Sequence, residues 1–293
     1  MAIHHPEQII HANGIDICTD AYGDRANPAM LLIMGAGASM LLWEEGLCQG
    51  LADAGRFVIR FDNRDVGRTT CCAPGEPNYT LQDMADDAVA VLDHYRIDKA
   101  HICGASMGGM ITQLVGLNHP DRVLSLIVIM SSPDPAAVTN PMEGKAGALS
   151  PPTQEVMAAA AAGATLDWSD TDAVLANRVE MFGVLAGSAY PYDADSRRVL
   201  FRKEIERAGS IASGQNHGLV VGASARWIDR LAEITAPTLV IHGDEDPILP
   251  LDHGQAIADG IAGSEMLVMA GVGHELPDQE VSRLIATISE FTS

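Results

Sequence analysis

One serine in this chain stands where a nucleophile could stand. It is the centre of a G-x-S-x-G pattern at residues 104–108, within HICGASMGGM, and it follows a short apolar run. Between a strand and a helix, such a turn needs small neighbours and exposes the hydroxyl of Ser106 at the carboxyl edge of a sheet. The amides that open the helix favour negative charge developing nearby. A glycine-rich turn that only joins strand to helix would look the same, so this motif alone leaves catalysis open.

A serine hydroxyl is a weak nucleophile at neutral pH and needs a histidine base with an acid that orients it. The chain order expected for this kind of turn is serine, then Asp or Glu, then histidine, each after a later strand. The loop GDEDP at 243–247 supplies three carboxylates after an apolar run, and GVGH at 271–274 ends in His274 after the next run. Three elements in the right order predict that Ser106 is the nucleophile and His274 its base.

Acyl transfer also needs donors for the oxyanion, usually the amide after the nucleophile and one from a loop after an early strand. Met107 supplies the first amide. The loop at 34–37, MGAG, lets the backbone approach a substrate closely, and we expect the Ala36 amide to be the second donor. A loop kept small only for packing is the alternative.

The other histidines have plainer interpretations. His242 closes an apolar run, His101 begins one, and His119 lies by a helix end, while His217 and His253 are expected to be surface or cap residues. Each is expected to be a satisfied polar side chain. Since no group of residues has metal-ligand spacing, neither a metal nor a cofactor is expected.

Apolar runs and helical patterns alternate around these motifs. Strands are predicted at 14–21, 29–34, 57–61, 100–103, 123–130, 237–242 and 265–269. Helices are predicted at 42–54, at 80–95 with a capping box at Thr80 and Asp83, near 254–261, and at 278–291. This alternation predicts an α/β fold whose mostly parallel sheet is covered on both faces.

The alternation stops between residues 131 and 226. Helical segments at 171–185 and 193–208 occur there without a convincing strand. We therefore predict a core of residues 1–130 and 227–293, interrupted by a helical cap at 131–226 in the position of a lid. No internal repeat is found.

Composition excludes several classes of function. The chain has 293 residues, 47% of them hydrophobic, and a net charge of −21, which would repel nucleic acid and anionic lipid. The longest nearly apolar stretch, 29–43, is broken by glycines, and the N-terminus lacks a basic, apolar leader. Five cysteines without a C-x-x-C pair are expected to be reduced, so a cytoplasmic protein is expected. The sequence does not separate a monomer from a dimer.

Several stretches together carry a family resemblance. They are LLIMGAGASMLLW, VIRFDNRDVGRTT, DMADDAVAVLDHYRIDKAHICGASMGGMITQLVGLNHPDRV, PTLVIHGDEDPILPLDHG and GVGHELP. The chain resembles the α/β-hydrolase superfamily of the Ser-Asp-His type, and more narrowly the aclacinomycin methylesterase group.

The resemblance assigns roles to residues of this chain. It implies Ser106 as nucleophile, Asp246 as acid and His274 as base, with the amides of Ala36 and Met107 as oxyanion donors. It also implies that Asp62, Arg64 and Gly67 form a structural loop. Met34 departs from the pattern, because most of the superfamily has a histidine there.

The expected function is hydrolysis of a small-molecule ester through an acyl-enzyme. No arginine or lysine stands in the predicted catalytic loops, so neutral carboxylic esters are expected, with short to medium acyl chains or a methyl group. Apolar residues of the cap could line the pocket, although their helical spacing is also typical of core packing: Met157, Trp168, Met181, Phe182 and Leu185. A carbon-carbon bond hydrolase, an amidase or a perhydrolase would use the same triad. A ligand receptor of this fold with little turnover is the alternative from another class.

Overall fold

The computed structural model describes residues 2–139 and 148–293. Its centre is one eight-stranded sheet in the order β1-β2-β4-β3-β5-β6-β7-β8. The pairs β1–β2 and β2–β4 are antiparallel and all the others are parallel, as the sequence predicts. The strands are β1 His4–Ala12, β2 Ile15–Tyr22, β3 Ala29–Ile33, β4 Phe57–Phe61, β5 Ala100–Ala105, β6 Val123–Ile129, β7 Thr238–Gly243 and β8 Glu265–Met269. The first strand was not predicted.

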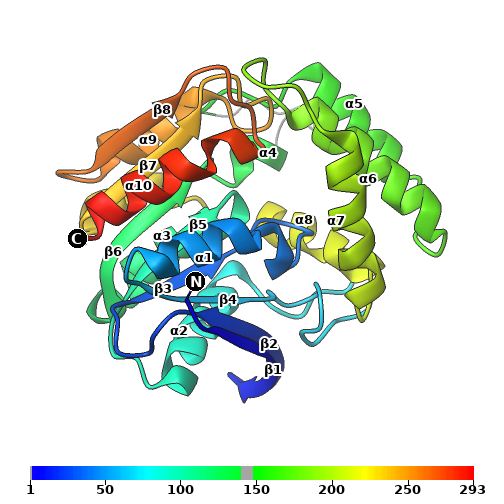
Figure 1. The fold of residues 1–293 in the computed structure, drawn as a ribbon. Coiled ribbons are helices and arrows are strands. Elements are labelled where there is room, and N and C mark those ends of the chain that lie inside the picture. The colour runs from blue at the N-terminus through cyan, green and yellow to red at the C-terminus, as the bar shows by residue number, and fades with distance from the viewer. Residues whose placement is uncertain (1, 140–147) are drawn as a thin grey trace.

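Helices cover both faces of this sheet (Figure 1). The α-helices are α1 Glu45–Asp53, α2 Leu81–Tyr95, α3 Met107–Asn118, α4 Ala136–Thr139, α5 Gln154–Gly163, α6 Thr171–Leu185, α7 Ala194–Arg207, α8 Asn216–Gly222, α9 Leu251–Gly260 and α10 Val281–Phe291. The predicted capping box of α2 is present: the Thr80 hydroxyl accepts from the Asp83 amide while the Asp83 carboxylate accepts from the Thr80 amide. The helix expected at 42–54 divides into a 3-10 turn at Met40–Leu42 and α1.

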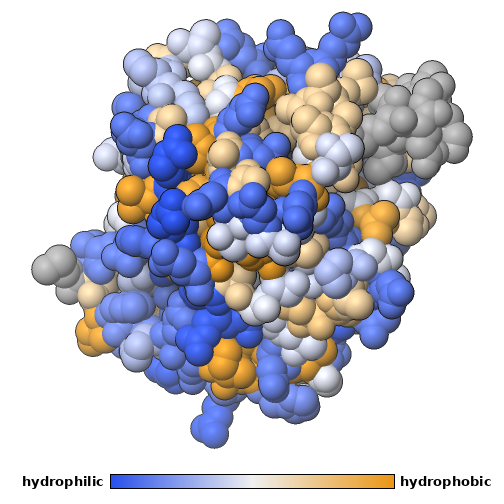
Figure 2. All heavy atoms as spheres, turned by 90° about the vertical axis from the view of Figure 1, so that its right-hand side faces the viewer, coloured by the Kyte–Doolittle hydropathy of each residue, from blue (hydrophilic) through white to orange (hydrophobic). Residues whose placement is uncertain are grey.

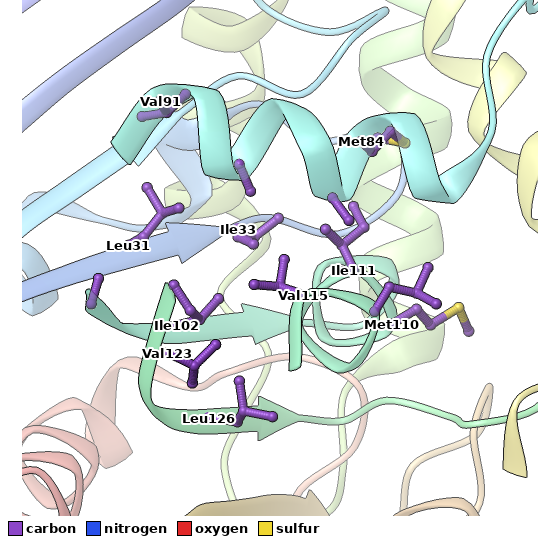
Figure 3. Close-up of a cluster of buried hydrophobic side chains, with 14 of the residues drawn as sticks. Leu31, Ile33, Met84, Val91, Ile102, Met110, Ile111, Val115, Val123 and Leu126 are labelled. Atoms are coloured by element: carbon purple, nitrogen blue, oxygen red, sulfur yellow. The ribbon is translucent and has the colours of Figure 1, made fainter. Parts of the chain in front are cut away.

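Two hydrophobic clusters hold these layers together. On one face, side chains of β3, β5 and β6 pack against α2 and α3, as Figure 3 shows for Ile33, Ile102 and Leu126 opposite Met84 and Ile111. On the other face, α1 and α10 cover the sheet through residues such as Leu51 and Ile288. The inner strands β3 to β7 are buried on both sides, which is why they read as continuous apolar runs.

The chain between β6 and β7 forms helices and turns wherever the structure describes it. We call α5 to α8, residues 154–222, the cap helices. In Figure 1, α5, α6 and α7 stand together at one side of the molecule, apart from the helices that cover the sheet. Viewed from that side, the surface is mostly hydrophilic, with hydrophobic residues in small separate areas (Figure 2). Residues 140–147 of the predicted insertion 131–226 lie outside the described residues, and the insertion's boundaries stay a prediction.

Candidate active site

Ser106 occupies the turn between β5 and α3 in a backbone conformation that L-residues rarely adopt, with φ 56° and ψ −121°. The turn leaves no space for larger neighbours. A Cβ on Gly104 would collide with the carbonyl oxygen of Gly108, and a Cβ on Gly108 would collide with that of Ile33. Because a strained residue persists only where its surroundings hold it, this geometry fixes the hydroxyl at the sheet edge.

The structure brings Ser106, His274 and Asp246 into one hydrogen-bonded chain. The His274 Nε2 lies 3.0 Å from the Ser106 Oγ, and its Nδ1 lies 2.6 Å from the Asp246 Oδ2. The carboxylate can only accept, so Nδ1 carries a proton and Nε2 is free to accept the serine proton. This is the arrangement that a serine nucleophile with a histidine base requires.

Asp246 is the carboxylate of its loop that faces the histidine. Its second oxygen accepts from the amides of Ile248 and Leu249, at 2.9 and 2.8 Å. Burial pushes the pKa of Asp246 up, but the neighbouring His274 and these hydrogen bonds outweigh burial and hold the pKa below its ordinary value. Asp246 is therefore ionised at neutral pH. The Asp244 carboxylate instead accepts from the Gly271 amide at 2.6 Å, in a hydrogen bond that is exposed to solvent.

The loop after β3 lies directly against the nucleophile. A Cβ on Gly35 would stand 3.0 Å from the Ser106 Cβ, so any larger residue there would push against the turn that holds the nucleophile. The next residue, Ala36, lines the cavity beside Ser106. Its amide and that of Met107, the first residue of α3, have no hydrogen-bond acceptor within residues 2–139 and 148–293. Both are thus available to an oxyanion.

A cavity of about 300 Å³ opens over the Ser106 hydroxyl. Three of the five cap residues that the sequence suggested for a pocket line it: Met181, Phe182 and Leu185. Met157 and Trp168 are not among its described lining residues. Further apolar lining comes from Leu42, Met130, Phe201, Ile248 and Leu276.

The cavity also has a charged end that the sequence did not indicate. Arg197 of α7 reaches it and bonds to Glu275 and Glu44, both at 2.5 Å, and to Asp278 at 3.3 Å. Glu275 directly follows His274; burial raises its pKa, although Arg197 opposes that rise. We call these four residues the Arg197 cluster. No local pattern in ADSRRVLFRKEIER separates this arginine from its neighbours, so its place could not have been read from the sequence.

Two of the remaining histidines differ from expectation in their burial. His253 was expected to be a surface or cap residue, but it is fully buried in α9 and bonds to Ser132 and the Ser150 carbonyl. His217 does belong to the predicted cap but is also fully buried. Within the described part of the chain, no cluster of three His, Cys, Asp or Glu residues could hold a metal ion. The helices there are also too short or too polar to cross a membrane.

The sheet order, the turn at Ser106 and the hydrogen-bonded triad define a hydrolase of the α/β-hydrolase type. Residues 28–281 match the family described as the alpha/beta hydrolase fold. The chain belongs to this family, and it is an enzyme.

Curated relatives extend over almost the whole chain. The chain is 30% identical to rhodomycin D methylesterase DnrP of Streptomyces peucetius, and the match covers 98% of each protein. It is 26% identical to a 2-hydroxymuconate semialdehyde hydrolase of Pseudomonas sp. strain CF600, over 94% of this chain and 90% of that one. A meta-cleavage product hydrolase of Pseudomonas fluorescens IP01 shares the fold, with a TM-score of 0.77 at 20% identity over 97% and 96% of the two chains.

Proposed function

We propose that this enzyme hydrolyses neutral carboxylic esters through an acyl-enzyme on Ser106. The observation that carries the proposal is the chain of hydrogen bonds from Ser106 through His274 to Asp246 at the floor of an apolar cavity. The relative named a methylesterase supports ester hydrolysis. The semialdehyde hydrolase, whose named substrate is not an ester, keeps a carbon-carbon bond hydrolase as the second candidate.

The proposed reaction has two halves, acylation of Ser106 and hydrolysis of the acyl-enzyme, and His274 acts as the base in both. His274 takes the Ser106 proton as Oγ attacks the ester carbonyl carbon, and the carbonyl oxygen becomes an oxyanion held by the amides of Ala36 and Met107. The alkoxide leaves with the proton from His274, and an acyl-enzyme remains. Water then attacks with His274 again as base, which releases the acid and restores Ser106.

The cavity supports a neutral, compact substrate. Arg197 is the only arginine or lysine among its described lining residues, and its guanidinium already faces three carboxylates. It therefore offers no unpaired positive charge to an anionic substrate. A volume of about 300 Å³ is at the small end for ligand pockets, which favours methyl esters or short to medium acyl chains over long-chain lipids.

The test compares wild type with Ser106→Ala on p-nitrophenyl esters of graded acyl length. The variant removes one hydroxyl at an unchanged fold, so turnover should be abolished; residual activity above about a thousandth of wild type would mean that another residue attacks. For the wild type, kcat/KM should peak at short to medium chains. A rate still rising at a palmitoyl ester, or a preference for a carboxylate-bearing ester, would contradict the proposed pocket. An absence of turnover on every ester would favour the ligand receptor.

A further inference from the structure

The loop that carries the Ala36 amide is held from both sides. On one side, the Asn63 side-chain amide donates to the Met34 carbonyl at 2.9 Å. On the other side, the Gly37 amide donates to the His217 Nδ1, also at 2.9 Å. The peptide that presents the Ala36 N–H therefore lies between two peptides whose orientations are fixed by side chains.

His217 comes from far away in the chain. It lies in α8, the last of the cap helices, 180 residues beyond Gly37. Its side chain is fully buried, and its Nε2 lies 2.6 Å from the Arg64 carbonyl oxygen. Since the Gly37 N–H can only donate, Nδ1 must accept. Nε2 must therefore carry the ring proton and donate it in a hydrogen bond to the Arg64 carbonyl oxygen. The two backbone partners thus fix one neutral tautomer.

The surroundings of His217 keep it in that state. Burial lowers the pKa of His217, against the opposing effects of the Arg64 carbonyl and Asp65. Beside it lies a hydrogen-bonded network in which the side chains of Asn216 and Tyr79 both donate to the Asp65 carboxylate, at 2.9 and 2.6 Å. The imidazole is therefore a rigid acceptor.

Gly37 is partly exposed, and its backbone is in the left-handed region that glycine adopts readily, with φ +67°. The hydrogen bond to His217 therefore fixes a peptide that glycine's own conformational freedom would leave loosely held. The loop at 34–37 reads MGAG, so none of its own side chains offers an oxygen or nitrogen acceptor to this amide.

We propose that His217 is a positioning residue that fixes the oxyanion loop, so that a cap helix sets the direction of the Ala36 amide. This inference rests on the proposed function, in which that amide binds the oxyanion. It makes α8 part of the machinery that stabilises the transition state. An oxyanion donor works only when it is aimed in advance, and small misplacements lower kcat more than substrate binding.

The experiment compares His217→Leu with His217→Asn. Leucine has no acceptor, so kcat should fall on the order of tenfold to a hundredfold while KM stays within about twofold. Asparagine places an oxygen near the Nδ1 position and should recover most of kcat. Affinity for butylboronic acid, whose tetrahedral adduct puts an oxygen where the oxyanion forms, should follow kcat/KM across the variants.

Tyr79→Phe is the matched control, because it removes a hydrogen bond from the same buried network without touching the oxyanion loop. It should lower the melting temperature and leave kcat unchanged. Wild-type kcat in His217→Leu would overturn the inference, as would equal losses of kcat in His217→Leu and Tyr79→Phe.

A variant that does not fold and a failure of the proposed function must both be distinguished from a failure of the role of His217. If His217→Leu does not fold, His217→Gln replaces it, because its amide extends past the Nδ1 position; kcat equal to that of His217→Asn would overturn the inference. If Ser106→Ala keeps its activity, the proposed function itself fails. An inactive Ser106→Ala beside a fully active His217→Leu would remove only the role of His217.

Discussion

At the carboxyl ends of β5 and β7 the geometry depends on the backbone, whereas the wall of the cavity that α6 and α7 form depends on side chains. Around Ser106, glycines are required because a Cβ would meet carbonyl oxygens. The cap helices instead face the core through apolar residues such as Phe182 and through the charged contacts of Arg197. Backbone sterics tolerate almost no change, while side-chain packing can be rearranged. The chemistry of this enzyme should therefore be harder to alter than its choice of substrate.

The largest effect should come from the acid. Asp246→Asn should lower kcat on the order of a thousandfold or more, because an amide NH₂ facing His274 Nδ1 favours the wrong tautomer. Asp244→Asn should have far less effect, because its side-chain oxygen can still accept from the Gly271 amide. Steady-state kinetics on one ester would decide, and the reverse ranking of the two variants would refute the assignment of Asp246.

A smaller effect is expected where the cap meets the core. Arg197→Met would leave Glu275 half-buried without its partner, so the free energy of unfolding should fall by about 2 kcal/mol and KM should rise. Arg197→Lys should recover only part of both, since one ammonium cannot reproduce contacts to Glu44, Glu275 and Asp278. Urea unfolding and kinetics measure the two quantities. Unchanged stability and KM in Arg197→Met would show that the Arg197 cluster does not hold the cap.

The wall of the cavity should control chain length. Phe182→Ala enlarges the pocket, so the ratio of kcat/KM for an octanoyl to a butanoyl ester should rise about threefold to tenfold, with each buried methylene worth up to ~0.8 kcal/mol. Trp168→Ala is the matched control, since it changes another aromatic residue of the same insertion that does not line the cavity. Equal changes in the ratio for both variants would contradict the lining of the pocket by α6.

The smallest effect concerns how stability depends on pH, because a histidine of the core, and not the active site, should cause part of the loss of stability in acid. Burial, with a contribution from Arg56, lowers the pKa of His101 to about 4, whereas an unfolded histidine titrates near 6.5. Between these values the unfolded chain binds more protons, so this histidine stabilises the fold above pH ~6.5 and that contribution is lost as pH falls to about 4.

Chemical unfolding at several pH values tests this reasoning. His101→Gln should flatten the acid side of the stability profile and leave the pH dependence of kcat unchanged. His94→Gln, at an exposed position, should keep the wild-type profile. A stability profile as steep in His101→Gln as in wild type would show that other groups cause the acid loss.

The sequence also predicts the sheet core better than it predicts the contacts of the cap. The runs that became β3, β4 and β8 are apolar and bounded by turns. Residues that follow different parallel strands meet, because the carboxyl ends of parallel strands lie at the same edge of the sheet. That is why Ser106, Asp246 and His274 could be placed together in advance. β1, with the sequence HHPEQIIHA, was missed because an edge strand that pairs only with β2 needs no apolar run.

The contacts that the sequence did not predict span long separations between ordinary residues. Arg197 meets Glu44 across 153 positions, and His217 meets Gly37 across 180. Neither has a local motif, because the position of a helix relative to a loop depends on the packing of the whole cap. The burial of His253 in α9 was also missed because its contact is long-range: its partner Ser132 lies 121 residues away.

The adjacency of β6 and β7 in the sheet has a consequence for protein engineering. The cap helices leave the core after one of these strands and return before the other, and the two strands pair directly with each other. A foreign cap can therefore be joined between them without interrupting the sheet, but it must replace the Leu185 carbonyl, which accepts from the His274 amide at 2.8 Å. Such a chimera would lose the acceptor that His217 provides to Gly37. A functional graft must therefore bring its own acceptor to that amide, which gives a concrete criterion for choosing donor sequences.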